Sequence, residues 1–128
     1  MRARNVELHS NVPDVRQFLG SCGVMTVPLR IGGGSRLKIL EALACGLPVV
    51  SSAVGAEGLQ LVPGQDYIVA EEDEMANALV RAIRQPETVR ALALYGRKFV
   101  LEHHDWSVLA RKLEQSWERC FSRSAITV

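Results

Sequence analysis

The sequence reads VMTVPLRIGGGSRLKILEALACGLPVVSS over residues 24–52, and this stretch decides the fold. An apolar run over 24–27 leads into three consecutive glycines, and a helical pattern of apolar residues then covers 35–45. Gly46 suits the position after a helix end. The run over 49–52 begins with two valines, as in a parallel strand that is covered on both faces. Strand, glycine loop, helix and strand in this order predict one unit of a parallel α/β sheet.

The rest of the chain continues the alternation of strands and helices. Together the patterns predict a single α/β domain over residues 1–128, a Rossmann-like parallel sheet of about four short strands with flanking helices. In such a sheet the ligand site lies at the carboxyl ends of the strands, which is where the glycine loop falls. Further strands are expected at 6–9 and 67–69, and 59–62 is an additional candidate for a brief strand. Further helices are expected at 15–21, 73–84, from 86 and from 105.

Size and composition narrow the class of protein. The 128 residues suffice for one domain, and the net charge of +1 supplies no overall field that would recruit nucleic acid or a membrane surface. No apolar run approaches the about 18 residues of a membrane span, and no signal-peptide pattern follows the N-terminus. The three cysteines are odd in number and lie in apolar surroundings, so we expect buried free thiols in a reducing compartment. We therefore predict a cytoplasmic protein.

Positive charge gathers around the glycine loop. Arg36 and Lys38 fall in the first turn of the predicted helix, where the helix dipole favours acidic side chains instead. Arg30 stands on the other side of the loop. Because glycines leave backbone N–H groups accessible, these three cations predict a site for a phosphate-bearing ligand.

The loop does not match the common phosphate-binding motifs. No Lys-Ser or Lys-Thr pair follows the glycines, as a P-loop would need. The loop supplies only the first two glycines of a G-x-G-x-x-G fingerprint, and the next strand ends in Ser51-Ser52 where an acidic residue would hold the ribose. A dinucleotide-binding domain remains an alternative. The adjacent pair His103-His104 makes a poor metal site, and no Asp-x-Asp occurs, so no metal is expected.

The longer segment from Val24 to Ser51 resembles the donor-binding half of family-4 glycosyltransferases, which are retaining enzymes of the two-domain GT-B type. The pattern glutamate-alanine-x-alanine-x-glycine-x-proline-valine-valine over 41–50 carries most of the resemblance. It continues through 55–59 and as far as Asp105-Trp106. The resemblance implies that the chain binds a UDP- or GDP-linked sugar and uses no metal or other cofactor.

The resemblance also implies the roles of individual residues. Glu41 would accept hydrogen bonds from the ribose hydroxyls, as an ionised carboxylate can. The 32–34 loop would face the sugar and the diphosphate, and the 11–13 turn would lie near the base. Arg36 or Lys38 would neutralise the phosphate. The full set of predicted donor-binding residues is Arg30, Gly32, Gly33, Gly34, Ser35, Arg36, Leu37, Lys38 and Glu41.

Two departures from the family pattern affect the expected activity. The family carries a second glutamate eight positions before Glu41, and that position is Gly33 in this chain. The chain also begins about midway through the donor-binding domain, without the first strands of that domain and without the N-terminal acceptor domain. No catalytic residue is therefore assigned, and the acceptor stays unidentified.

Alternative roles remain open at this point. The chain is either the donor-binding part of a glycosyltransferase or a non-catalytic nucleotide-binding or interaction module. Glu41 could simply pair with Lys38 on a helix surface, although its apolar neighbours predict partial burial. Trp106 and Trp117 lie on one apolar stripe and are expected either to pack within the domain or to meet the acceptor domain. An unpaired sheet edge could support a homo-oligomer, and peripheral attachment of the parent enzyme to the inner membrane also stays open.

Overall fold

A three-stranded parallel sheet forms the centre of the computed structural model, which describes residues 5–124. Its strands are β1 (Met25–Val27), β2 (Val49–Ser51) and β3 (Ile68–Val69), and they lie side by side in chain order. Met25 pairs with Val49, and Val50 pairs with Ile68. The predicted Rossmann-like α/β class is therefore confirmed, with three strands in place of about four.

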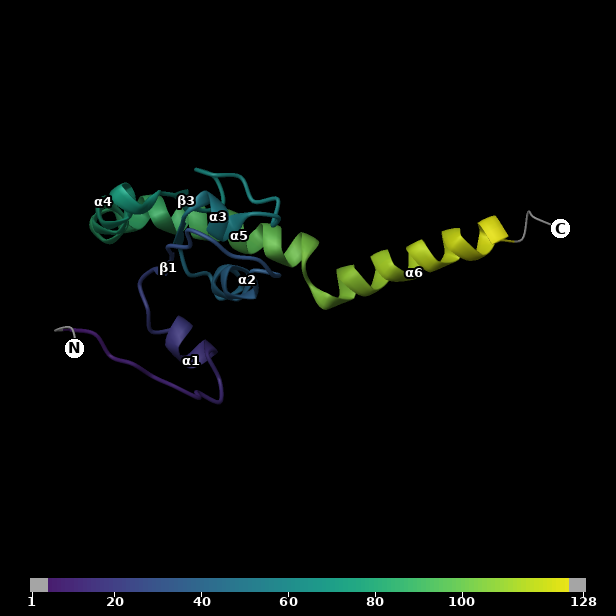
Figure 1. The fold of residues 1–128 in the computed structure, drawn as a ribbon, viewed down its shortest axis with the longest axis horizontal. Coiled ribbons are helices and arrows are strands. Elements are labelled where there is room, and N and C mark those ends of the chain that lie inside the picture. Colours follow the sequence, from purple (N-terminus) through teal and green to yellow (C-terminus); the bar gives the residue numbers. More distant parts are fainter. Residues whose placement is uncertain (1–4, 125–128) are drawn as a thin grey trace.

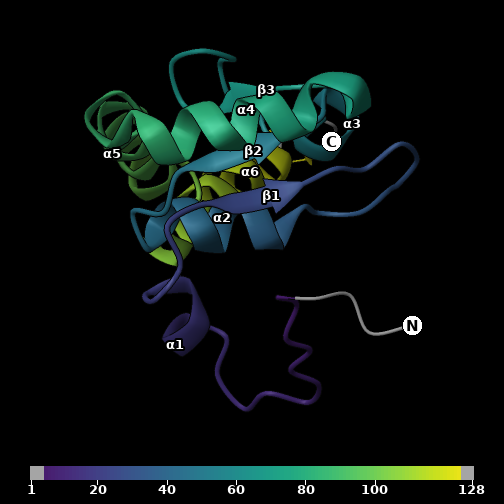
Figure 2. The ribbon, with the colours of Figure 1, turned by 90° about the vertical axis from the view of Figure 1, so that its left-hand side faces the viewer.

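Helices follow each strand and cover the sheet (Figure 2). A short α1 precedes the sheet and α2 joins β1 to β2, whereas α4, α5 and α6 follow β3 without interruption by further strands. Their bounds are α1 (Arg16–Leu19), α2 (Leu37–Ala44), α3 (Ala53–Ala56), α4 (Glu72–Arg84), α5 (Pro86–His103) and α6 (Trp106–Ser124).

The two faces of the sheet bury two separate apolar clusters. Consecutive residues of a strand point to opposite faces, so Val49 and Val50 of β2 serve different clusters. Val49 packs in the cluster that includes Ile39 and Leu43 of α2, and Val50 packs in the cluster that includes Met75 of α4. Figure 2 shows α2 and α4 on opposite faces. This double coverage explains why β2 is apolar at consecutive positions.

Helix α2 is also pressed against α5, and a glycine makes this contact possible. A Cβ atom at Gly96, in the middle of α5, would lie 2.7 Å from the backbone oxygen of Asp66 and 2.7 Å from a methyl carbon of Leu43. Leu43 is fully buried. The absent side chain at Gly96 therefore lets α5 approach α2 and the loop before β3.

Two predicted strands are absent from the described residues. The segment over 6–9 is extended but unpaired, with Val6 and Leu8 exposed by 67% and 91%, because no neighbouring strand is present for it to join. Figure 2 shows this segment away from the sheet, to the right of α1. The 59–62 run is apolar because Leu59 enters the core from a loop. Near it only an isolated bridge joins Pro63 to Tyr67.

The position of α6 differs from the expectation that its apolar side packs within the domain. Figure 1 shows α6 projecting from the body of the domain. Trp106 and Trp117 are exposed by 85% and 57%, so they do not pack within the domain as one prediction held. Their contact with an acceptor domain stays a prediction. The expected burial of the cysteines is also wrong, because all three are exposed. None of the helices within residues 5–124 is long and apolar enough to cross a bilayer.

We expect the Gly96→Ala variant to be less stable than the wild type, by about 1–3 kcal/mol in free energy of unfolding, because the added methyl group meets a backbone oxygen that cannot move freely. Alanine ordinarily stabilises a helix relative to glycine by about 1 kcal/mol. A loss of stability in Gly96→Ala would therefore come from the tight packing at this position. Urea denaturation measures the difference. Gly23→Ala is the matched control, since a Cβ atom there meets no atom within 4 Å. A more stable Gly96→Ala variant would contradict the packing described above.

Candidate functional site

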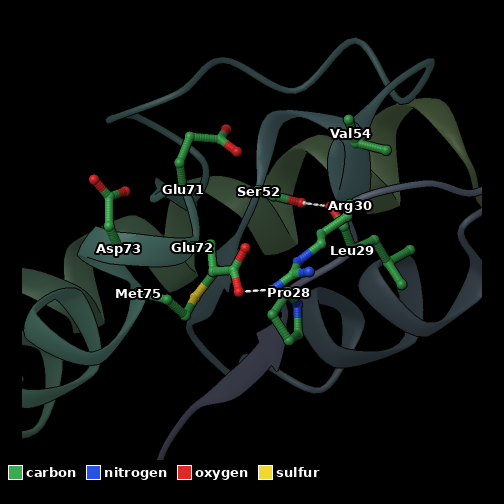
Figure 3. A pocket seen from close by; sticks show the side chains of 9 residues that line it. All are labelled: Pro28, Leu29, Arg30, Ser52, Val54, Glu71, Glu72, Asp73 and Met75. Atoms are coloured by element: carbon green, nitrogen blue, oxygen red, sulfur yellow. Dashed lines mark hydrogen bonds and ion pairs between the residues drawn. The ribbon is translucent and has the colours of Figure 1, made fainter.

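The carboxyl ends of the three strands meet at one edge of the sheet and form a cavity of about 630 Å³. The segments that follow β1, β2 and β3 each contribute to its wall, as expected for a parallel sheet. Figure 3 shows these side chains, which are Pro28, Leu29, Arg30, Ser52, Val54, Glu71, Glu72, Asp73 and Met75.

Ser52 connects the segments on two sides of this cavity. Its buried hydroxyl donates a hydrogen bond of 2.6 Å to the carbonyl oxygen of Leu29 and accepts one of 3.1 Å from the N–H of Gly55. The second bond caps α3, a short helix that is not among the helices expected from the sequence. The Glu71 carboxylate accepts a further hydrogen bond from the N–H of Ala53. The loop after β1 and the start of α3 are thereby held together.

The cavity carries more acidic than basic groups. Arg30, predicted to face the phosphate, forms an ion pair with Glu72 at the start of α4 (Figure 3). Glu71 and Asp73 also line the cavity. An anionic ligand at this position would meet three carboxylates, so the predicted phosphate contacts must be sought at the glycine loop outside the cavity.

The glycine loop itself is open to solvent. Gly32, Gly33, Gly34 and Ser35 are exposed, and Gly34 has a φ of 98°, a backbone conformation that favours glycine. Within residues 5–124, the N–H groups of Gly33, Gly34, Leu37 and Lys38 have no protein acceptor. The last two belong to the first turn of α2, where the helix geometry leaves them unpaired. The loop and the helix start therefore present free donors.

Arg36 lies beneath this loop and not at its surface. Its side chain is only 5% exposed, and its guanidinium donates hydrogen bonds to the carbonyl oxygens of Gly32 at 2.9 Å, Gly33 at 3.1 Å and Val54 at 2.9 Å. The carboxylate of Glu57 lies 3.9 Å away. Arg36 also has a φ of 53°, a left-handed conformation that costs a non-glycine residue about 1–2 kcal/mol. The surrounding hydrogen bonds offset this strain.

The remaining predicted residues lie on the exposed side of α2. Leu37, Lys38 and Glu41 are all exposed, and their spacing places them on one helix face. Glu41 is therefore not partly buried, as its apolar neighbours suggested. Since a helix rises about 1.5 Å per residue, the Glu41 Cα lies only about 6 Å along the axis from the Cα of Leu37. The carboxylate and the free N–H groups of the helix start are thus accessible from the same side.

Glu41 also lines a smaller cavity of about 370 Å³ between α2 and the turn before α1. Its other walls are Ala44 at the end of α2, Cys45 directly after it, and the residues 13–16. Arg16 donates hydrogen bonds to both carboxylate oxygens of Asp14, and these bonds lower the pKa of Asp14. The turn next to the predicted ribose-binding residue is therefore held by its own ion pair.

Two functional features of this edge were missed by sequence reasoning. Ser52 carried no signal beyond its position at a strand end, although such positions are favoured for ligand sites and helix caps. No signal in the sequence showed that Arg36 points inward. An arginine at a helix start suits a phosphate contact as well as it suits hydrogen bonds to backbone carbonyl groups. Among the described residues, no group of three or more His, Cys, Asp and Glu side chains is arranged to hold a metal ion.

Comparison with known proteins identifies the family of this chain. A family described as glycosyl transferases group 1 matches residues 1–85. The chain therefore belongs to the group 1 glycosyltransferases. This result agrees with the GT-B resemblance found in the sequence.

Individual relatives support the same class. The chain is 30% identical over 118 residues to the MMP alpha-(1->4)-mannosyltransferase of Mycolicibacterium hassiacum, covering 88% of this chain and 28% of the relative. It is 36% identical over 95 residues to the D-inositol 3-phosphate glycosyltransferase of Frankia alni, covering 72% of this chain and 23% of the relative. Among solved structures, sucrose-phosphate synthase from Thermosynechococcus elongatus matches with a TM-score of 0.73 and 27% identity, over 85% of this chain and 28% of that one. The chain thus spans between 23% and 28% of the length of these proteins.

We expect the Ser52→Ala variant to lose about 1–3 kcal/mol of stability, because both the Leu29 carbonyl and the α3 cap lose their partner in a buried place. Urea denaturation measures this loss. Ser10→Ala, at an exposed position in the N-terminal segment, is the matched control and should leave the midpoint unchanged. Equal stability of the two variants would show that the Ser52 hydroxyl does not hold this edge together.

Proposed function

We propose that this chain is the donor-binding part of a retaining family-4 glycosyltransferase and that it binds a UDP- or GDP-linked sugar on the exposed side of α2. In this proposal the chain contributes the donor-binding side of the enzyme, and an acceptor domain supplies the other side. The observation that carries the proposal is the common accessibility of the Glu41 carboxylate and the free N–H groups at the start of α2.

Each part of the donor has a matching group on this side of the molecule. The unpaired N–H groups of Leu37 and Lys38 suit the diphosphate, since a helix start favours anions. The exposed Lys38 adds a positive charge. Glu41 suits the vicinal hydroxyls of the ribose, and the cavity between Glu41 and the 13–16 turn has room for the base. The glycine loop, with its free N–H groups, would then lie beside both the sugar and the diphosphate.

The reaction would use these groups mainly for the leaving diphosphate. As the bond between the sugar and the diphosphate breaks, negative charge grows on the phosphate oxygens. Fixed N–H donors and Lys38 would stabilise that charge without rearrangement. This scheme assigns no base or nucleophile to the chain, consistent with Gly33 standing where the family carries a glutamate.

Gly33 supports a second candidate function, nucleotide binding without sugar transfer. Without the carboxylate that the family places beside the donor sugar, the chain could bind a nucleotide without turning over its sugar. Both candidates share the nucleotide site. They differ in whether the chain, joined with an acceptor domain, transfers the sugar of a labelled nucleotide sugar.

We expect UDP or GDP to bind the wild-type chain in isothermal titration calorimetry, and the Glu41→Ala variant to bind at least about tenfold more weakly, because hydrogen bonds to a charged group contribute about 1.5–3 kcal/mol. Glu114→Ala, at an exposed position of α6, is the matched control and should bind as the wild type does. Binding of NAD in place of UDP and GDP would favour the dinucleotide alternative. Equal affinities of the Glu41→Ala and Glu114→Ala variants would remove Glu41 from the site.

Cys45 offers an independent test of the base position. It is exposed and lines the cavity beside Glu41, whereas Cys22 lines none of the cavities described above. We expect saturating UDP or GDP to slow the modification of Cys45 by N-ethylmaleimide and to leave the rate at Cys22 unchanged, as followed by peptide mass spectrometry. Unchanged rates at both cysteines, together with measurable nucleotide binding, would place the base elsewhere.

A further inference from the structure

The glycine loop is supported from its inner side by the buried guanidinium of Arg36, so its outer side stays open to solvent. Two carbonyl groups of the loop, those of Gly32 and Gly33, accept hydrogen bonds from the Arg36 guanidinium. The carbonyl group of Val54, in α3, accepts a third. One side chain therefore joins the loop to the segment that follows β2.

The direction of these carbonyl groups determines the direction of the loop N–H groups. In a trans peptide unit the C=O and the N–H point in opposite directions, and the described residues contain no cis peptide bond. The carbonyls of Gly32 and Gly33 point inward to Arg36. The N–H groups of the same two peptide units belong to Gly33 and Gly34, and they consequently point away from the buried guanidinium.

We infer that Arg36 is a positioning residue, which turns the N–H groups of Gly33 and Gly34 outward as donors for the ligand and does not itself contact that ligand. This inference rests on the proposed nucleotide site for the identity of the ligand. It differs from the role expected from the sequence, in which Arg36 or Lys38 meets the phosphate.

Burial and the pattern of donors both favour this role over direct contact. Arg36 is 5% exposed, and both hydrogens of its Nη2 are directed to the carbonyl oxygens of Gly32 and Val54. Its Nε is buried and has no partner among the described residues. A Cβ atom at Gly32 would lie 3.0 Å from Nη1 of Arg36, so the loop is closed tightly on the guanidinium. A phosphate would have to displace the loop in order to reach it.

The Arg36→Lys variant separates the two roles. Lysine keeps the positive charge but not the planar fork that reaches several carbonyl groups at once. We expect Arg36→Lys to bind UDP or GDP at least about tenfold more weakly than the wild type in calorimetry. Arg84→Lys, at an exposed position at the end of α4, is the matched control and should bind normally. Wild-type affinity in Arg36→Lys would overturn the positioning role and favour a simple charge contact.

The Arg36→Gly variant adds a rescue experiment. Glycine accepts the φ of 53° without strain, so this variant loses the guanidinium but not the backbone conformation. Methylguanidinium should restore nucleotide binding to Arg36→Gly, and methylammonium at the same concentration should not. Equal rescue by both cations would contradict the inference, because only the guanidinium shape can hold several carbonyl groups.

A readout without nucleotide distinguishes failure of this inference from failure of the proposed function. The amide resonances of Gly33 and Gly34 should shift in the ¹⁵N NMR spectrum of Arg36→Lys, and the resonance of Gly23 should not. If the wild-type chain binds neither UDP nor GDP, the proposed function fails, and these resonances still decide whether Arg36 orients the loop. Unchanged Gly33 and Gly34 resonances in a folded Arg36→Lys variant would reject that role.

Discussion

The one-sided burial of α2 is the constraint on which the rest of the structure depends. Ile39, Ala42 and Leu43 are fully buried against the sheet and α5. This packing fixes the rotation of the helix about its axis, because turning it would expose these side chains to water. The opposite side, with Lys38 and Glu41, is then necessarily open. The proposed contacts of Lys38 and Glu41 with a nucleotide sugar follow from that orientation.

The three cations around the glycine loop have different environments, although the sequence alone does not distinguish their roles. Arg30 pairs with Glu72 across the cavity at the sheet edge. Arg36 is enclosed by backbone carbonyl groups, and Lys38 is exposed at the start of α2. Of the three, only Lys38 combines exposure with a place beside free N–H groups. A local concentration of positive charge in the sequence thus separates into one ion pair, one internal support and one surface charge.

Much of the fold could be predicted because local signals and tertiary packing agree. The valines of β2 are continuous since the strand is covered on both faces, and Gly46 follows α2 as expected, with a φ of 75°. The 6–9 segment failed as a strand for the converse reason. Its sequence suits an extended chain, but a strand also needs a neighbour with which to exchange backbone hydrogen bonds. The exposed stripe of α6 has the same origin, since periodicity indicates an apolar side without indicating what covers it.

The sequence by itself determined the class of fold, the family and the identity of the candidate residues, because these depend on the order of residue types along the chain. Tertiary structure alone decided the direction in which each side chain acts. Arg36 turns inward because the carbonyl groups of Gly32, Gly33 and Val54 converge beneath the loop, and Val54 is distant from the other two in sequence. Glu41 turns outward because α5 and the sheet occupy the other side of its helix. Such convergence of distant segments leaves no periodic trace in a sequence, so it becomes visible only when the chain is folded.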